Sequence, residues 1–268
     1  MKDIYALIGN PVGHSLSPAM HNRAYREMGI DACYVAFEVT DLKGAVSGIR
    51  ALGIKGVSVT IPFKTAVLTY LDEIEEEALA LGAVNTIINE KGYLRGTNTD
   101  WWGVVLALRE VMEISGKTFV IVGAGGTAQA ALYGIRKEGG NPIIVNRTPE
   151  KGRALAERVG CPFYPLEELK RIKADCLINT TPVGMYPHVD VSPVEAEVLK
   201  NFPYVMDVIY NPLTTKLLRE ARAQGAVTIL GLSMFVYQGA RQITLWTKGE
   251  PPLWAMREEV LKHLQKET

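Results

Sequence analysis

The chain lacks several features that mark particular classes of protein. Its 268 residues include only three cysteines, which are scattered and have no histidine at the spacing of metal ligands. This excludes a disulfide framework and a structural zinc site, and it fits a reducing compartment. Lysine plus arginine and aspartate plus glutamate number 29 each, so the formal net charge is zero. A neutral chain has no electrostatic footprint for nucleic acid or for an anionic membrane.

Long apolar runs are missing as well. No stretch reaches the roughly 18 consecutive apolar residues of a membrane-spanning helix, and the run from Ile4 to Ile8 is too short for a secretory signal. We therefore expect a soluble cytoplasmic protein, monomer or homodimer, that acts on a small molecule and has no metal, nucleic acid or membrane as partner. With 47% hydrophobic residues, the chain can fill the cores of two modest domains.

The most informative stretch is TFVIVGAGGTA, from Thr118 to Ala128. Its β-forming residues lead into a glycine cluster and then into an alanine-rich helix pattern, which predicts a strand, a tight turn and a helix. Gly123 permits the turn, Gly125 lets backbone approach a pyrophosphate, and Ala128 is small enough for helix-on-strand packing. The first N–H groups of the helix would then face the phosphates. A dinucleotide site is predicted, although methyltransferases and flavoproteins use similar loops.

The end of the next strand, residues 142–146, indicates which dinucleotide. An NAD site places an acid there for the ribose 2′-hydroxyl, whereas this chain has Asn146-Arg147-Thr148, with Lys151 following. A guanidinium and a hydroxyl suit a 2′-phosphate, so the pattern favours NADP. Alternatively, Arg147 is a solvated loop residue and Thr148 only the N-cap of the next helix, ahead of Pro149.

Strands and helices alternate from Thr118 onward, which is typical of a doubly wound parallel sheet. We expect strands at 118–122, 142–146, 175–179, 204–208 and 227–230, separated mostly by helices. The loop of residues 180–187 follows the third strand, where it could cover a nicotinamide. Two further helices, 233–246 and 252–265, are predicted to follow the sheet.

The first hundred residues hold a second set of strands that end in polar loops. A strand over 4–8 precedes a loop with Ser15 and Ser17, and a strand over 56–60 ends at Thr60 and runs into a loop with Lys64. Ser17 is expected to be the N-cap of a helix that has Pro18 at its first position. Parallel sheets bind their ligands at such strand ends.

Other segments of this half are less regular. Asp41 should cap a helix that Gly53 ends, and an acidic helix is expected over 72–81. Residues 93–100 show no hydrophobic alternation.

Each polar residue of this half also has a simpler interpretation. Lys64 could be a solvated loop lysine, Asn85 a turn residue, and Asp100 the cap of a helix over 101–112. His14 and His21 lie too far apart across a loop and a helix to share a metal, so packing or support of neighbouring residues is the preferred role.

Taken together, the strand-end loops resemble the shikimate dehydrogenase family over the full length of the chain. The resemblance rests on nine motifs in the family's order: GNPVGHSLSP (9–18), VSVTIPFK (57–64), GAVNT (82–86), GTNTD (96–100), GAGGTA (123–128), NRT (146–148), NTTPVGM (179–185), DVIYNP (207–212) and GLSMFVYQ (231–238).

The resemblance implies an α/β fold of two domains. Residues 1–100 plus 233–268 would form an α/β substrate domain, and residues 101–232 a Rossmann-type doubly wound parallel sheet that binds NADP. The implied activity is the reversible NADPH-dependent reduction of 3-dehydroshikimate to shikimate, in the pathway to chorismate and the aromatic amino acids.

The resemblance also assigns site residues by their matching positions. Lys64 and Asp100 match the catalytic pair. The substrate would be held by Ser15, Ser17, Thr60, Asn85, Tyr210 and Gln238. The cofactor would be held by Gly123, Ala124, Gly125, Gly126, Thr127, Asn146, Arg147, Thr148, Lys151, Val208 and Gly231.

These residue types suit the implied chemistry. A polyol carboxylate needs many hydroxyl and amide partners, because each unpaired buried polar group costs about 1–3 kcal/mol. Ser15 and Ser17, with the helix that follows them, would offer donors and a positive dipole end to the carboxylate. We hypothesise that Lys64 rests protonated and acts as the acid in reduction, while Asp100 holds both the lysine and a substrate hydroxyl.

Three rival functions are weighed against this one. Some members of the family oxidise quinate or prefer NAD; the NAD-preferring type would be expected to carry an acid near the end of the second strand, where this chain has Arg147, and Ser15 with Ser17 fits the shikimate type. A non-catalytic NADP-binding regulator would be expected to lose Lys64 and Asp100. A methyltransferase that uses the glycine loop would also need an acid at the end of the second strand.

Overall fold

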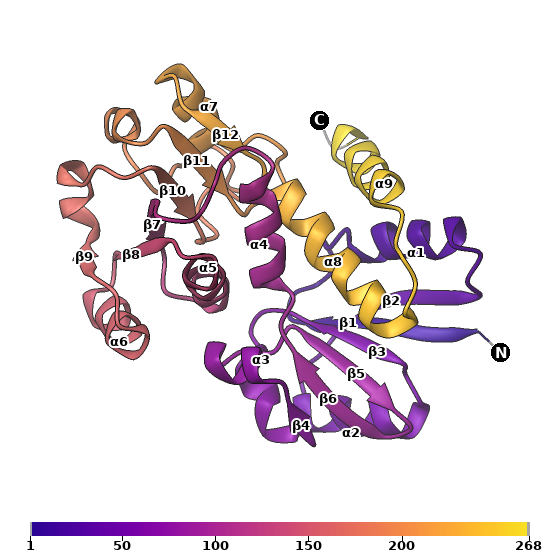
Figure 1. The fold of residues 1–268 in the computed structure, drawn as a ribbon. Coiled ribbons are helices and arrows are strands. Elements are labelled where there is room, and N and C mark those ends of the chain that lie inside the picture. Colours follow the sequence, from indigo (N-terminus) through magenta and orange to yellow (C-terminus); the bar gives the residue numbers. More distant parts are fainter. Residues whose placement is uncertain (1, 267–268) are drawn as a thin grey trace. The chain divides into compact units, whose positions relative to one another are not determined.

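The computed structural model describes residues 2–266, so residues 1, 267 and 268 of the predicted domain ranges lie outside the described residues. The chain splits into two compact units (Figure 1). Unit 1 comprises Met1–Thr99 and Val236–Thr268, and unit 2 comprises Asp100–Phe235. The predicted α/β fold with a Rossmann-type sheet is confirmed. Within residues 2–266, no helix has the length and apolar character needed to cross a membrane.

Unit 1 is built on a six-stranded mixed sheet in the order β2-β1-β3-β5-β6-β4. Strands β2, β1 and β3 are parallel, whereas β5 runs antiparallel to both of its neighbours. The strands are β1 (Asp3–Gly9), β2 (Ala32–Glu38), β3 (Gly56–Val59), β4 (Glu73–Ile74), β5 (Thr86–Glu90) and β6 (Tyr93–Thr97). Its helices are α1 (Ser17–Glu27), α2 (Leu42–Leu52), α3 (Glu76–Leu81) and α9 (Leu253–Lys266), with a 3-10 turn at Ala66–Tyr70.

Helix α2 shows how local sequence sets the ends of an element. The carboxylate of Asp41 accepts a hydrogen bond from the Gly44 N–H at 3.0 Å, and Gly53 ends the helix in the left-handed region at φ +64°. Both residues act as predicted. Val46 and Ile49 turn toward the sheet and are buried in an apolar core with Val57 and Ile87.

Two segments of unit 1 differ from what their sequence pattern suggests. The acidic helix expected over 72–81 begins only at Glu76, because residues 73 and 74 form β4 beside β6. Asp72 instead accepts hydrogen bonds from Arg50 and from the Leu94 N–H, and the bond to Arg50 is the main cause that lowers the pKa of its carboxyl. The segment without hydrophobic alternation is β6, which pairs antiparallel with β5.

Unit 2 is an all-parallel sheet in the order β12-β11-β10-β7-β8-β9. This is the strand order of dinucleotide-binding folds, and the order reverses between β7 and β10. The strands are β7 (Thr118–Val122), β8 (Asn141–Asn146), β9 (Phe163–Pro165), β10 (Cys176–Asn179), β11 (Tyr204–Asp207) and β12 (Val227–Ile229). The helices are α4 (Asp100–Arg109), α5 (Gly126–Lys137), α6 (Pro149–Val159) and α7 (Lys216–Ala223), with 3-10 turns at Leu166–Arg171 and Ala196–Asn201.

The faces of the unit 2 sheet are covered as its sequence pattern requires. Val120 and Val122 point into a buried cluster that includes residues of α7, while the alternate residues Phe119 and Ile121 are fully buried on the other face. Helix α5 packs on β7 and β8 and against α4. One long helix, α8 (Gly231–Thr247), begins in unit 2 and continues in unit 1.

Candidate active site

The first candidate residues lie in the loop between β1 and α1. Helix α1 begins at Ser17 and has Leu16 at its N-cap, so the prediction that Ser17 is the cap is wrong. Ser15 supplies the oxygen instead: its hydroxyl accepts a hydrogen bond from the Ser17 N–H at 3.2 Å. Both serines therefore lie at the positive end of the helix dipole, the place expected for a carboxylate.

His21 lies one turn into the same helix and has a packing role. Its Nδ1 donates to the Ser17 carbonyl at 2.9 Å, and its ring stacks on Tyr34 with 4.1 Å between centroids. Burial lowers the pKa of His21 to about 4, so the ring is neutral at physiological pH. His14, in contrast, is exposed.

Thr60, Lys64 and Asn85 are brought together at the end of β3. The Thr60 N–H bonds to the Ile8 carbonyl at 2.9 Å, and the Asn85 carbonyl accepts from the Val59 N–H at 2.8 Å. The Lys64 carbonyl accepts from the Val84 N–H, also at 2.8 Å. Three polar residues from two separate loops are thus tied by their backbone to one edge of the unit 1 sheet.

The side chain of Asn85 is buried and held by hydrogen bonds on both of its polar ends. Its Oδ1 accepts from the Thr99 N–H at 2.8 Å and from the Thr86 hydroxyl at 2.7 Å, and its Nδ2 donates to Thr99 Oγ1 at 3.1 Å. These bonds fix Thr99, the residue immediately before Asp100. Asn85 is therefore more than the turn residue that its local sequence allowed.

The helix α8 contributes Gln238, which is half-buried. One turn later the helix carries Gln242, a residue that the sequence analysis missed. Gln242 is fully buried and bonds to Ser58 of β3 and Thr86 of β5. Because its partners are 184 and 156 residues away in sequence, no local pattern indicates its role.

In unit 2, the glycine loop lies between β7 and α5, at the point where the strand order reverses. Gly123 has φ +120°, a conformation that side chains rarely adopt, and a Cβ there would lie 2.6 Å from Thr180 Oγ1. Gly125 is the N-cap of α5 and has an ordinary φ of −88°. A Cβ on Gly125 would meet no atom of the described chain within 4 Å, so the space beside it is open.

The residues expected at the 2′-phosphate follow β8. Arg147, Thr148 and Lys151 are all exposed, and the Asn146 side chain donates to the Thr148 carbonyl at 2.8 Å. Thr148 is the N-cap residue of α6, yet within the described chain its hydroxyl makes no capping hydrogen bond. Two cations and a hydroxyl therefore border the start of a helix, an arrangement that suits a phosphate.

Gly231, the first residue of α8, lies against the backbone of Val208 and Ile209, just before Tyr210. A Cβ on Gly231 would come within 2.3 Å of the Ile209 carbonyl oxygen and 2.6 Å of the Val208 carbonyl carbon. Only glycine therefore lets the start of α8 lie against this backbone. Tyr210 stacks on Phe235 with 4.1 Å between ring centroids, which holds its ring in one orientation.

A buried carboxylate, also missed in the sequence, organises the same loops. Asp207 accepts hydrogen bonds from Asn179 Nδ2 at 3.0 Å, from the Ile209 N–H at 3.1 Å and from the Thr215 hydroxyl at 2.6 Å. Asn179 also accepts from Thr181. Burial raises the pKa of Asp207 to about 6. The loops after β10 and β11 are thus tied to one group.

The expected catalytic pair is divided between the two units. Lys64 belongs to unit 1 and is half-buried, whereas Asp100 is the first residue of unit 2 and of α4 and is buried. The helix α4 ends at Arg109, three residues before the predicted end.

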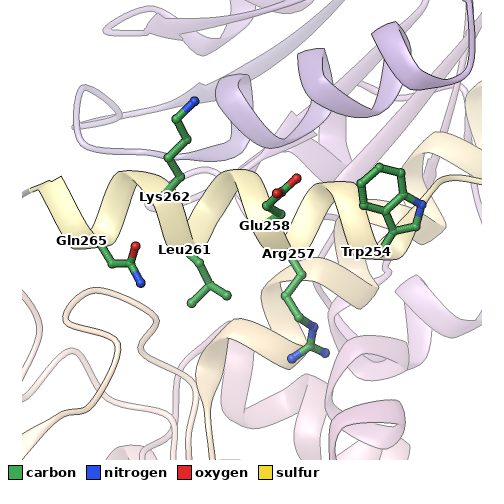
Figure 2. Close-up of a pocket in the computed structure, with 6 residues that line it drawn as sticks. All are labelled: Trp254, Arg257, Glu258, Leu261, Lys262 and Gln265. Atoms are coloured by element: carbon green, nitrogen blue, oxygen red, sulfur yellow. The ribbon is translucent and has the colours of Figure 1, made fainter.

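A separate hollow of about 540 Å³ lies on the surface of α9, and its described lining includes none of the predicted site residues (Figure 2). It is lined by Trp254, Arg257, Glu258, Leu261, Lys262 and Gln265. All six side chains come from a single helix (Figure 2), and among them are both cations and an acid. Nothing in this set provides the convergent polar groups of a catalytic site.

Comparisons with known proteins point in one direction. Residues 7–87 match the family model described as "Shikimate dehydrogenase substrate binding domain", residues 105–192 match "Shikimate / quinate 5-dehydrogenase", and residues 231–261 match "Shikimate 5'-dehydrogenase C-terminal domain". A curated relative from Methanothermobacter thermautotrophicus, named shikimate dehydrogenase (NADP(+)), is 45% identical over 97% of this chain and 96% of its own length.

Solved structures agree with the sequence relatives. A shikimate dehydrogenase crystallised with NADP+ is 43% identical, with a TM-score of 0.93, over 98% of this chain and 96% of its own. The Thermus thermophilus shikimate 5-dehydrogenase, in complex with NADP(H) and shikimate, is 37% identical, with a TM-score of 0.90, over 97% of this chain and 99% of its own.

Proposed function

Because the chain belongs to the shikimate dehydrogenase family, we propose that it catalyses the reversible NADPH-dependent reduction of 3-dehydroshikimate to shikimate, a step toward chorismate and the aromatic amino acids. The observation that carries the proposal is the near full-length match to NADP-dependent relatives, together with the open glycine loop at the strand-order reversal of unit 2. We further propose that the enzyme works in the cytoplasm as a monomer or homodimer.

The residues after β7 and β8 fit NADP. The open space at Gly125 leaves room for a pyrophosphate over the N-terminus of α5, where unpaired N–H groups and the helix dipole favour negative charge. Arg147, Thr148 and Lys151 are exposed and suit a 2′-phosphate. Val208 and Gly231 would border the nicotinamide end.

Substrate recognition is assigned to hydroxyl and amide groups. Ser15 and Ser17 at the start of α1 would bind the carboxylate, and Thr60, Asn85, Tyr210 and Gln238 would bind the ring hydroxyls. Their support is positional: Thr60 and Asn85 lie at one edge of the unit 1 sheet, and Asn85 is already fixed by Thr86 and Thr99. A fixed amide binds a hydroxyl without the entropy cost of becoming ordered.

Proton handling is assigned to Lys64 and Asp100. When bound, the nicotinamide supplies or accepts the hydride. Lys64, as an ammonium, would donate a hydrogen bond and then the proton to the developing alkoxide, and Asp100 would hold Lys64 and a neighbouring hydroxyl. General acid catalysis of this kind contributes about 10²–10⁴ in rate.

The test is the initial rate of NADP+ reduction with shikimate, measured beside quinate and beside NAD+. We expect a preference for shikimate and NADP+, and a fall in kcat of about 10²–10⁴ in both Lys64→Ala and Asp100→Asn, with NADPH binding unchanged. An increase in KM alone for Lys64→Ala would contradict its role as the acid.

Two other results would replace the proposal. A preference for quinate or NAD+ would show that the enzyme is a broader member of the family. NADPH binding without turnover of either substrate would indicate a regulator.

A further inference from the structure

A chain of buried hydrogen bonds crosses unit 1 and ends on Asn85. We call it the Gln242 relay, and it consists of Tyr34, Ser58, Gln242, Thr86 and Asn85. The Tyr34 hydroxyl bonds to Ser58 Oγ at 2.6 Å, and Ser58 Oγ bonds to Gln242 Oε1 at 2.8 Å. Gln242 Nε2 bonds to Thr86 Oγ1 at 2.9 Å and to the Asn85 carbonyl at 3.3 Å, and Thr86 Oγ1 bonds to Asn85 Oδ1 at 2.7 Å.

The relay has one direction, because each hydroxyl carries a single proton. Gln242 Oε1 only accepts, so Ser58 donates to it and in turn accepts from Tyr34. Gln242 Nε2 only donates, so Thr86 accepts from it and gives its own proton to Asn85 Oδ1. The orientation of the Gln242 amide therefore favours the arrangement in which the Oδ1 end of the Asn85 amide faces Thr86.

The buried state of the relay makes this orientation strict. Tyr34 and Gln242 are 1% exposed, Thr86 is fully buried and Asn85 is 2% exposed. Water cannot replace a lost partner in such surroundings, so a reversed amide would leave polar atoms unpaired. The Thr99 N–H, which donates to Asn85 Oδ1, favours the same orientation.

We propose that Gln242 is a positioning residue for the substrate: through Thr86 it helps to hold the Asn85 amide with Oδ1 as the acceptor of the Thr86 hydroxyl and the Thr99 N–H, which leaves Nδ2, the donor to Thr99 Oγ1, as the donor end of the amide. This inference rests on the proposed function, in which Asn85 binds a substrate hydroxyl. Gln242 itself does not touch the substrate.

The proposal is tested by steady-state kinetics of Gln242→Met, which nearly keeps the side-chain volume and removes the three hydrogen bonds of the amide. The KM for shikimate should rise about tenfold, the loss of one hydrogen bond, while kcat and the KM for NADP+ stay within about twofold. Gln242→Glu should have the same effect, because a carboxylate accepts from Thr86 and takes away the proton given to Asn85.

A double-variant comparison separates positioning from a general structural role. If Gln242 acts through Asn85, then Asn85→Ala combined with Gln242→Met should bind shikimate no more weakly than Asn85→Ala alone. Multiplied effects in the double variant would overturn the proposal. The matched control is Asn89→Leu, which removes a buried amide of β5 that bonds to Ile49 and Ile54, outside the relay. It should lower the melting temperature and leave the KM for shikimate unchanged.

Two further measurements cover the remaining outcomes. If Gln242→Met does not fold, Thr86→Val removes the last donor of the relay and should raise the KM for shikimate equally; an unchanged KM would refute the relay. If the wild-type protein does not oxidise shikimate, the proposed function fails. The NMR resonances of the Asn85 side-chain NH₂ group then test the inference. They should shift in Gln242→Glu and stay in place in Asn89→Leu, and any other result would overturn it.

Discussion

The replacement Gly125→Ala separates stability from cofactor binding at the glycine loop. Gly125 has an ordinary φ of −88°, and a Cβ there would meet no atom of residues 2–266 within 4 Å. Alanine lowers the entropy of the unfolded chain, which stabilises the folded state by about 0.4–1 kcal/mol. Alanine is also a poorer N-cap than glycine, which destabilises the folded state by a similar amount. The free energy of unfolding should therefore change by less than about 0.5 kcal/mol.

NADP+ binding should respond very differently. The methyl group would occupy the space over the first N–H groups of α5, where the pyrophosphate is proposed to lie. Losing one charged hydrogen bond costs about 1.5–3 kcal/mol, so the Kd for NADP+ should rise between about tenfold and 150-fold. Isothermal titration with NADP+ measures this change, and chemical unfolding measures the stability of the same sample.

The matched control is Gly48→Ala, in α2 of unit 1. A Cβ on Gly48 also meets no atom of the described chain within 4 Å, so this variant should bind NADP+ as the wild type does. An unchanged Kd for Gly125→Ala would show that no phosphate passes over Gly125, and the assignment of the glycine loop would have to be abandoned. A large loss of stability would equally refute the reasoning.

Three further outcomes follow from the site. Arg147→Ala should raise the KM for NADP+ by about 10–100-fold and leave the KM for NAD+ unchanged, because only NADP+ carries the 2′-phosphate; equal effects on both cofactors would contradict the contact. Gly231→Ala should lower the free energy of unfolding by about 1–3 kcal/mol, since its Cβ would meet the backbone of residues 208–209, and an unchanged melting temperature would be inconsistent with that packing. Asp207 holds its proton more tightly in the folded chain, with a pKa of about 6, than in the unfolded chain. Protonation of Asp207 therefore stabilises the folded chain fully below about pH 4. As pH rises through 6 this stabilisation is lost, and the free energy of unfolding falls by up to about 3 kcal/mol. Urea unfolding should therefore show that the difference in stability between wild type and Asp207→Asn changes over that interval, and a constant difference would show that the carboxyl titrates normally.

The sequence predicts unit 2 well because the residues that define its strands and turns are neighbours in the chain. Short apolar runs such as Thr118–Val122 are buried on both faces in a parallel sheet, and the glycines at its end mark the turn. The strand β9 was missed because Phe163–Pro165 is short, partly exposed and at the edge of the sheet.

Unit 1 is harder to predict because polar residues form part of its interior. Thr86 and Thr97 are buried in neighbouring strands, and Asn85 and Thr99 satisfy each other by hydrogen bonds. Hydrophobic periodicity cannot reveal strands whose buried residues are polar. Gln242 could not be predicted either, because the hydrogen-bond partners of its buried amide, Ser58 and Thr86, lie in strands far away in the sequence.

The site residues show a similar division. The spacing of Gly123 and Gly125 by itself predicts a dinucleotide-binding turn, whereas the sequence around Lys64 or Asn85 is compatible with an ordinary loop. For these residues the order of motifs along the whole chain is the signal, and their assigned roles remain predictions for the kinetic variants to decide.

The two-part construction of unit 1 has a consequence for the order in which the protein folds during synthesis. Unit 2 is one continuous segment, Asp100–Phe235, whereas unit 1 needs residues from both sides of it. Thr86 leaves the ribosome 156 residues before its partner Gln242, a delay of about 8–30 s at about 5–20 residues per second. During that interval Ser58 of β3 and Thr86 of β5 lack the partner that Gln242 later provides. The nascent chain therefore completes its proposed cofactor unit first, and a chain terminated after Phe235 would retain that unit while its proposed substrate unit stayed unfinished.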